Sequence, residues 1–347
     1  MKIAMISFTG NGRRLERSLA HELEKEGHQV LQAVKCKELE SDKDAVKCSA
    51  REWTGEQFRT RDVLIFIGAV QIAVRLIAPF IGSKTTDPAV LVLDEKGQYC
   101  IPILSGHIGG ANEMAERIAE MAGALPVITT ATDIRGKWAI DVFARKNHLY
   151  IEDMQKAKQI SVKILEGKTV VAVIESGRDS IEGTVPEEVK IVPETYENPD
   201  IYIGIYERKL SSHVLRLIPQ RITVGIGCRR GTSAEQIEQL VDKILKESHI
   251  NKKSIGRIAS IDLKKDEEGL LTFCNKYNIE PEFYPAEELK KVEGEFSVST
   301  FVKKVTGVDN VCERSAVYTG GTLRIRKQAE NGVTAAFAWD NWRVKFE

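Results

Sequence analysis

The stretch Lys2–Val34, KIAMISFTGNGRRLERSLAHELEKEGHQVLQAV, decides the fold class. It opens with an apolar run over Lys2–Phe8, which a glycine-containing loop follows. Leucines then recur every four residues from Leu15 to Leu23, the spacing of one helix face, and a second apolar run covers His28–Val34. Strand, loop, helix and strand in this order predict the start of a parallel α/β sheet.

The rest of the chain repeats this alternation. Asp62–Ile67 is apolar on both faces, which indicates a central parallel strand. Ala89–Leu93 and Tyr99–Leu104 flank the polar turn Asp94–Gly97 and predict a hairpin. The polar span Glu175–Pro199 is predicted to be loop, and the strand–loop–helix pattern restarts at Arg221. We therefore expect an α/β fold throughout, with an N-terminal parallel-sheet domain over 1–135, a middle α/β module over 136–220 and a C-terminal α/β domain over 221–347.

Composition excludes several classes of function. The 347 residues carry 50 Lys plus Arg and 50 Asp plus Glu, so no basic excess is available for nucleic acid. No apolar run approaches the roughly 20 residues that a membrane helix needs, and the N-terminus lacks a signal-peptide pattern. The six cysteines and six histidines do not cluster, which predicts reduced thiols and no metal held by the protein. A cytoplasmic enzyme or binding protein is expected.

The densest group of polar residues lies between Lys84 and Asp133, where polar side chains repeatedly follow apolar strands. Ligands of open α/β sheets bind at the carboxyl ends of strands. Within this region S-G-H-I-G-G-A-N separates Leu104 from a predicted helix, and its Ser105, Gly106, Gly109 and Gly110 would present backbone N–H groups to an anion. A simple tight turn is an equally good interpretation of the glycines alone.

His107 lies inside this loop and is the first candidate for proton transfer, the alternative being a ring that bonds its own loop. Asp87 precedes a proline and Asn112 and Glu113 begin a helix, so each has a structural interpretation beside the functional one. The remaining candidates are Lys84, Asp133, Arg75 in an otherwise apolar helix, and the arginines of the second glycine loop, Arg229 and Arg230.

Three ordered motifs resemble the cobalt-precorrin-5A hydrolase family of anaerobic cobalamin synthesis. They are K-T-T-D-P-A-V-L-V-L-D-E-K-G from Lys84, L-S-G-H-I-G-G-A-N-E from Leu104 and V-I-T-T-A-T-D, which ends at Asp133. V-G-I-G-C-R-R-G-T, I-A-S-I-D-L-K-K-D-E and F-S-V-S-T-F-V in the last domain also resemble the family, and a similar domain occurs as a small separate protein of the aerobic branch. The resemblance covers both ends of the chain, and the middle module is less distinctive.

The resemblance implies a hydrolase that opens the δ-lactone of cobalt-precorrin-5A and releases the extruded two-carbon unit as acetaldehyde. Cobalt would then arrive inside the substrate, with no cofactor held by the protein. We expect His107 as general base, Lys84 or loop N–H groups at the oxyanion, and Asp87, Glu113 or Asp133 in proton transfers. Arg75, Arg229 and Arg230, with the Ser105–Gly110 loop and Asn112, would hold substrate carboxylates.

Two alternatives stay open: a non-catalytic carrier of a tetrapyrrole intermediate, and a phosphate- or nucleotide-binding α/β enzyme. Neighbouring enzymes of the cobalamin pathway and a homodimer are the further partners considered.

Overall fold

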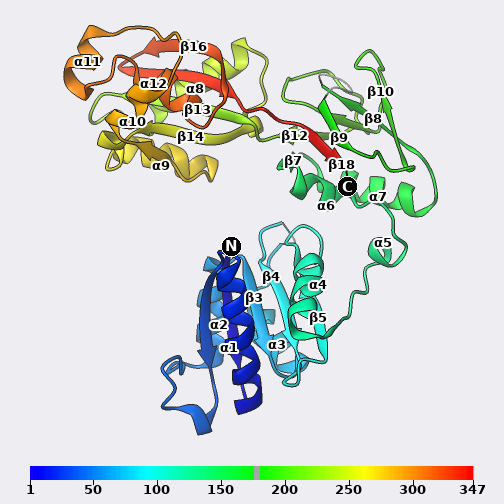
Figure 1. The fold of residues 1–347 in the computed structure, drawn as a ribbon. Coiled ribbons are helices and arrows are strands. Elements are labelled where there is room, and N and C mark those ends of the chain that lie inside the picture. The colour runs from blue at the N-terminus through cyan, green and yellow to red at the C-terminus, as the bar shows by residue number, and fades with distance from the viewer. Residues whose placement is uncertain (84, 176–179, 347) are drawn as a thin grey trace. The chain divides into compact units, whose positions relative to one another are not determined.

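The computed structural model describes residues 1–83, 85–175 and 180–346 (Figure 1). The chain divides into two compact units, Met1–Val142 and Phe143–Glu347. The predicted α/β class is confirmed, because every sheet of more than two strands contains parallel pairs and is packed with helices. In the part of the chain that the structure describes, no helix is both long and apolar enough to cross a membrane.

The first unit is built on a six-stranded sheet with the order β2-β1-β3-β4-β5-β6. Its strands are β1 Lys2–Ser7, β2 Gln29–Val34, β3 Val63–Ile67, β4 Ala89–Leu93, β5 Tyr99–Leu104 and β6 Leu125–Pro126. Its helices are α1 Gly10–Lys25, α2 Ala50–Thr60, α3 Val70–Ile77, α4 Ala111–Ala122 and α5 Ala131–Ile134, and α6 Ile140–Lys146 begins in this unit.

Helices cover both faces of this sheet. Side chains of α1 and α4 pack on one face with Ile65 and Leu91, whereas α2 and α3 pack on the other with Leu64 and Val90 (Figure 1). β3 is buried along its whole length, as its uninterrupted apolar sequence predicts. Burial on both faces of the sheet is the main source of stability of this unit.

The predicted hairpin is confirmed, and it decides where the candidate site lies. β4 and β5 pair antiparallel, whereas β2, β1, β3 and β4 are mutually parallel. β6 pairs parallel with β5. The loops that follow β5 and β6 therefore lie at the amino ends of the four parallel strands. The candidate site thus follows the carboxyl ends of β5 and β6, as predicted. It does not lie at the carboxyl ends of β1 to β4, because the hairpin reverses the direction of the chain.

The second unit contains two five-stranded sheets. The first has the order β10-β8-β11-β12-β7 and the second the order β15-β14-β13-β17-β16. The elements of the first are β7 Leu149–Ile151, α7 Met154–Leu165, β8 Val170–Ile174, β10 Val189–Val192, β11 Ile201–Ile203 and β12 Leu215–Pro219. Those of the second are β13 Ile222–Cys228, α8 Ala234–Glu247, β14 Ile255–Ile261, α9 Glu268–Tyr277, β15 Glu282–Tyr284, α10 Ala286–Lys291, α11 Thr300–Thr306, α12 Val311–Val317, β16 Thr322–Glu330 and β17 Val333–Trp339.

A pair of very short strands adds a third sheet to this unit. β9 Ile181–Gly183 pairs parallel with β18 Val344–Phe346, so the last strand of the chain returns to the middle module (Figure 1). The prediction of loop over Glu175–Pro199 is therefore wrong for β9 and β10. Both strands are too short to show a clear alternation, and β9 depends on a partner far away in the sequence.

Candidate active site

The loop Ser105–Gly110 joins β5 to α4 and has a tightly folded backbone. Ser105 adopts a positive φ of 56°, which is rare for a residue with a side chain. Its carbonyl accepts the amide N–H of Ala111, and the Ser105 Oγ donates to the Asp87 carbonyl at 3.0 Å. A Cβ at Gly109 would overlap the Ser105 side chain, so the turn requires glycine there.

His107 projects from this loop into a cluster of polar side chains. Its Nε2 lies 2.9 Å from Asp133 Oδ2, and its Nδ1 lies 3.2 Å from the Asp141 carboxylate. Asn112 Nδ2 donates to the same Asp133 oxygen at 2.7 Å and to Thr130 Oγ1 at 2.9 Å. The structure therefore brings together three predicted site residues, His107, Asn112 and Asp133, which come from the loop, from α4 and from α5.

The two carboxylates change the protonation of the imidazole. The hydrogen bond that His107 donates to Asp141 raises the pKa of His107 to about 9, opposed by partial burial and assisted by the charge of Asp141 and by the hydrogen bond and charge of Asp133. Burial alone would raise the pKa of Asp141, but the bond and charge of His107 outweigh burial and lower it. His107 is therefore an imidazolium at neutral pH, and an imidazolium donates a proton and cannot accept one.

Some amide N–H groups of the loop donate hydrogen bonds within the loop itself, and others donate to no described residue. Those of Gly110, Ala111 and Asn112 donate to carbonyls of the same loop. The amides of Gly106, Ile108 and Gly109 donate to no residue that the structure describes. Only this second set matches the expectation that the loop offers donors to an anion.

Asp87 has a structural role in the described chain. Its carboxylate accepts the amide N–H groups of Gly82 and Ser83 at 3.0 to 3.2 Å and closes the turn before β4. Its backbone carbonyl binds Ser105, so the turn is tied to the site loop through the main chain. Lys84, predicted at the oxyanion, lies outside the described residues.

Four other predicted residues are exposed, two in the first unit and two in the second. Arg75 is exposed in the last turn of α3, and Glu113 is exposed in the first turn of α4, next to Asn112. Arg229 and Arg230 are exposed in the loop between β13 and α8, in the second unit. Their predicted contacts with substrate carboxylates stay predictions.

Three residues of the cluster were not predicted from the sequence. Asp141 lies in the first turn of α6, 34 residues from His107, and no motif marks it. Thr130 and Thr132 stand within the quoted T-T-A-T-D string, and Thr132 Oγ1 is 3.3 Å from His107 Nε2. The position of the threonines beside Asp133 was a usable signal, whereas Asp141 could be found only from the fold.

The side chains of the cluster are not arranged as a metal site. Within the described ranges, no group of three or more His, Cys, Asp or Glu side chains could hold a metal ion. Both ring nitrogens of His107 face carboxylates, and both carry protons in the charged ring. Neither nitrogen then has a lone pair for a metal.

Comparison with known proteins identifies the family of the chain. Three family profiles match in succession: cobalamin synthesis G N-terminal over 52–133, the cobalamin biosynthesis central region over 138–219 and cobalamin synthesis G C-terminus over 222–338. His107, Asn112 and Asp133 all lie in the first matched range. The fold and the three matched profiles thus define a multidomain α/β protein of the cobalamin synthesis G class.

Full-length relatives narrow this class. The chain is 35% identical over 299 residues to the cobalt-precorrin-5A hydrolase of Priestia megaterium, covering 82% of this chain and 79% of that protein. It is 35% identical over 292 residues to the cobalt-precorrin-5A hydrolase of Salmonella typhimurium, covering 80% and 82%. A crystal structure of a cobalamin biosynthesis protein G homolog from Sulfolobus solfataricus is 23% identical, covers 97% of each chain and has a TM-score of 0.43. The chain belongs to the cobalt-precorrin-5A hydrolase family.

Proposed function

We propose that the chain hydrolyses the δ-lactone of cobalt-precorrin-5A and releases the extruded two-carbon unit as acetaldehyde, giving cobalt-precorrin-5B. One observation carries the proposal: a charged His107 lies 2.9 Å from Asp133, within the range matched by the N-terminal family profile. Membership of the family supplies the substrate, and this pair supplies an acid and a base for hydrolysis.

Asp133 is the base in this proposal. Its Oδ2 accepts hydrogen bonds from Asn112 and His107, whereas its Oδ1 bonds to no residue of the described chain. Oδ1 takes a proton from the water that attacks the lactone carbonyl carbon. The carbonyl oxygen gains negative charge, and the amides of Gly106, Ile108 and Gly109, which donate to no described residue, are available to stabilise it.

His107 is the acid, and this role replaces the general base expected from the sequence. As the acyl carbon–oxygen bond breaks, the leaving alkoxide takes the Nε2 proton and becomes a hydroxyl group. The proton that Asp133 Oδ1 received from water then returns to His107 through a solvent water, because the 2.9 Å contact joins Nε2 to the other carboxylate oxygen, Oδ2. Water has been divided between the acid and alcohol products, and both side chains return to their starting states.

Loss of acetaldehyde follows from the alcohol that this step creates. The hydroxyl group loses its proton, the carbon–carbon bond to the macrocycle breaks, and the electron pair and a proton end on the ring carbon.

We further propose that cobalt enters only as part of the substrate and that the protein holds no cofactor of its own. All six cysteines are free thiols, as is usual in the reducing cytoplasm, where we place the reaction.

The test is anaerobic incubation of the full chain with cobalt-precorrin-5A, followed by mass analysis of the macrocycle and trapping of acetaldehyde. Asp133→Asn is expected to lower kcat about 100-fold, the usual scale of a lost general base. Asp94→Asn is the matched control, because the Asp94 carboxylate accepts only backbone amides of the hairpin turn between β4 and β5, and it should retain turnover.

Two results would contradict the proposal. A folded wild-type chain that binds the macrocycle and leaves it unchanged would favour the carrier. Equal turnover by Asp133→Asn and the wild type would remove Asp133 from the mechanism and leave the hydrolase activity in place.

A further inference from the structure

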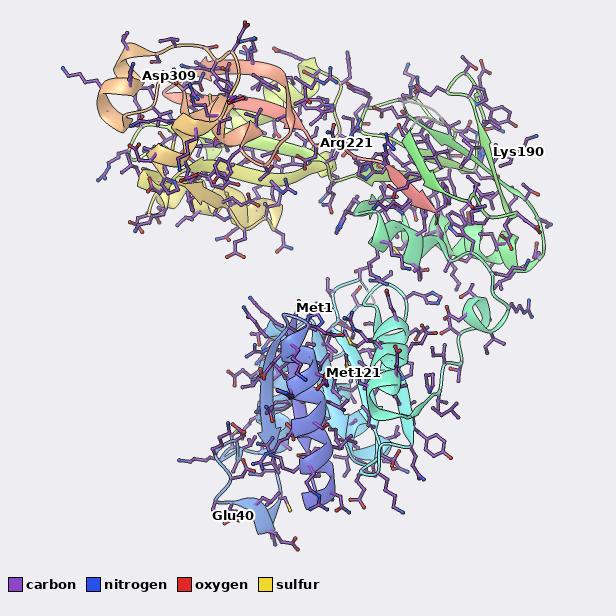
Figure 2. All side chains as sticks on the ribbon, viewed as in Figure 1. Met1, Glu40, Met121, Lys190, Arg221 and Asp309 are labelled. Atoms are coloured by element: carbon purple, nitrogen blue, oxygen red, sulfur yellow. The ribbon has the colours of Figure 1, made fainter. Side chains whose placement is uncertain are left out.

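The second unit contains a cavity of about 550 Å³ that none of the roles above uses. Its walls come from both five-stranded sheets and from the segment after β17, and they include Arg221, Arg324, Trp339 and Trp342. Arg221 lies where the chain passes from β12 to β13, as its label in Figure 2 shows. The cavity therefore lies between the middle module and the C-terminal sheet, within the second unit.

The two sheets are fixed to each other around this cavity. Tyr206 forms an antiparallel bridge with Ile250, and the amide of Asn251 donates to the Ile205 carbonyl at 2.8 Å. Trp342 Nε1 donates to the Asn147 carbonyl at 3.2 Å, which sets the plane of the indole. The walls are thus held by main-chain bonds, and the cavity is preformed.

Arg221 is held in the wall with part of its hydrogen-bonding capacity unused. Its guanidinium carbon lies 5.7 Å from the centre of the Trp342 ring, and its Nη2 lies 3.6 Å from Glu175 Oε1. Its Nε is buried and has no partner within the described chain. A buried donor without an acceptor is costly, so the position favours a ligand that accepts.

Arg324 reaches the cavity because of an irregularity in β16. Leu323 pairs with Ala338 and Ile325 with Phe337, so Arg324 is the extra residue of a bulge. A bulge turns a side chain away from its regular direction and is common beside functional sites. Arg324 forms no ion pair or hydrogen bond with any described residue.

The carboxylates of the cavity do not neutralise these arginines fully. Glu175 Oε2 accepts the amide N–H of Ile205 at 2.7 Å, and Asp340 pairs with Arg257 at 3.2 Å. Burial lowers the pKa of Arg221, and the charge of Arg324 adds to this in the same direction. Two guanidinium groups therefore face one space, and one of them has no counter-charge.

We propose that this cavity binds a carboxylate side chain of the tetrapyrrole substrate, with Arg324 as its ion-pair partner and Arg221 Nε as a second donor. The identity of the ligand rests on the proposed function. The cavity is too small for a whole macrocycle with its side chains, so it takes one edge of it. It is a binding subsite in the second unit and takes no part in the bond-breaking steps.

The experiment measures binding and turnover on the full chain. The binding probe is uroporphyrin III, a planar tetrapyrrole with eight carboxylates and no lactone, titrated by calorimetry. Arg324→Gln should raise its Kd about tenfold, the scale of one charge-assisted hydrogen bond, and Arg324→Lys should restore part of the affinity. Arg326→Gln is the matched control, because Arg326 lies on the same strand, is exposed and bonds only the Glu295 carbonyl.

With cobalt-precorrin-5A, Arg324→Gln should raise KM and leave kcat close to that of the wild type. Equal uroporphyrin affinity in Arg324→Gln and Arg326→Gln would overturn the subsite, and acetaldehyde release would then still support the hydrolase. If the folded wild type released no acetaldehyde, the hydrolase proposal and the ligand's identity would both fail, whatever the binding contrast.

Discussion

His107 shows how two neighbouring carboxylates can decide the role of a single residue. A histidine with an ordinary pKa near 6.5 would be mostly neutral at pH 7.5 and could accept a proton. Between Asp141 and Asp133 its pKa is raised to about 9, so it is charged and donates. The motif predicts a site at this residue, and in the proposed mechanism the surrounding carboxylates decide in which direction the proton moves.

This protonation predicts the pH dependence of turnover. In the proposed mechanism the imidazolium is the reacting form, so kcat should be level below about pH 9 on the alkaline side of the profile and fall as pH rises through the pKa of His107. Asp141→Asn removes the largest cause of the raised pKa, so the fall should begin at lower pH. The measurement is the pH profile of kcat together with the imidazole titration of His107 by NMR.

The same shift has a consequence for stability. The folded-state pKa of His107 is above its unfolded value, so its contribution to the free energy of unfolding is fully present below about pH 6.5 and is lost as pH rises through about 9. If kcat and the free energy of unfolding fell at the same high pH in Asp141→Asn as in the wild type, the result would contradict the raised pKa of His107.

At the scale of elements, the turn between β5 and α4 depends on Gly109. A Cβ there would overlap Ser105 and lie 2.9 Å from the Ser105 carbonyl oxygen, so Gly109→Ala must open the turn and displace His107. We expect about a 100-fold loss of kcat, because misplaced catalytic groups lose this much over about 1 Å. Gly10→Ala is the control: Gly10 has no atom within 4 Å of an added Cβ.

Thermal unfolding of the first unit should change little in Gly109→Ala, because the loop is at the edge of the sheet. Turnover equal to that of Gly10→Ala would show that the loop tolerates the extra atom and that the site does not depend on its shape.

The elements differ in how far the sequence predicts them. β1 and β3 are apolar on both faces and are predicted within one or two residues. β9 and β18 have three residues each and pair with each other from distant parts of the chain, so no local pattern marks them. Within the site, His107, Asn112 and Asp133 were predicted because motifs contain them. The contribution of Asp141 and the turn-closing role of Asp87 depend on contacts, which a sequence read locally does not contain.

At the scale of the whole molecule, three separate family profiles match the chain, yet the middle module and the C-terminal sheet share one hydrophobic core. Ile205, from the middle module, is fully buried in the same cluster as Val224 and Phe337 of the C-terminal sheet and Leu240 of α8. A shared core makes the two sheets unfold together, although the predicted boundary at 220 falls between them.

Ile205→Ala therefore should destabilise both sheets of the second unit, by about 2 kcal/mol or more for a buried isoleucine. Hydrogen exchange in denaturant, followed by mass spectrometry, should show peptides of β12 and β14 losing protection together. Ile65→Ala, in the core of the first unit, is the control and should affect only peptides of that unit. Loss of protection confined to the middle module would show that the two sheets unfold independently.

The pairing of β18 with β9 also constrains the order of events during synthesis. Lys345 donates its amide to Asn147, 198 residues earlier, and Phe346 stacks on Phe143. A chain emerging from the ribosome presents the middle module long before these partners exist. β9 has no strand partner until β18 has been translated, because these two strands form a sheet of their own. The small sheet therefore forms after the five-stranded sheet of the middle module has its whole sequence available.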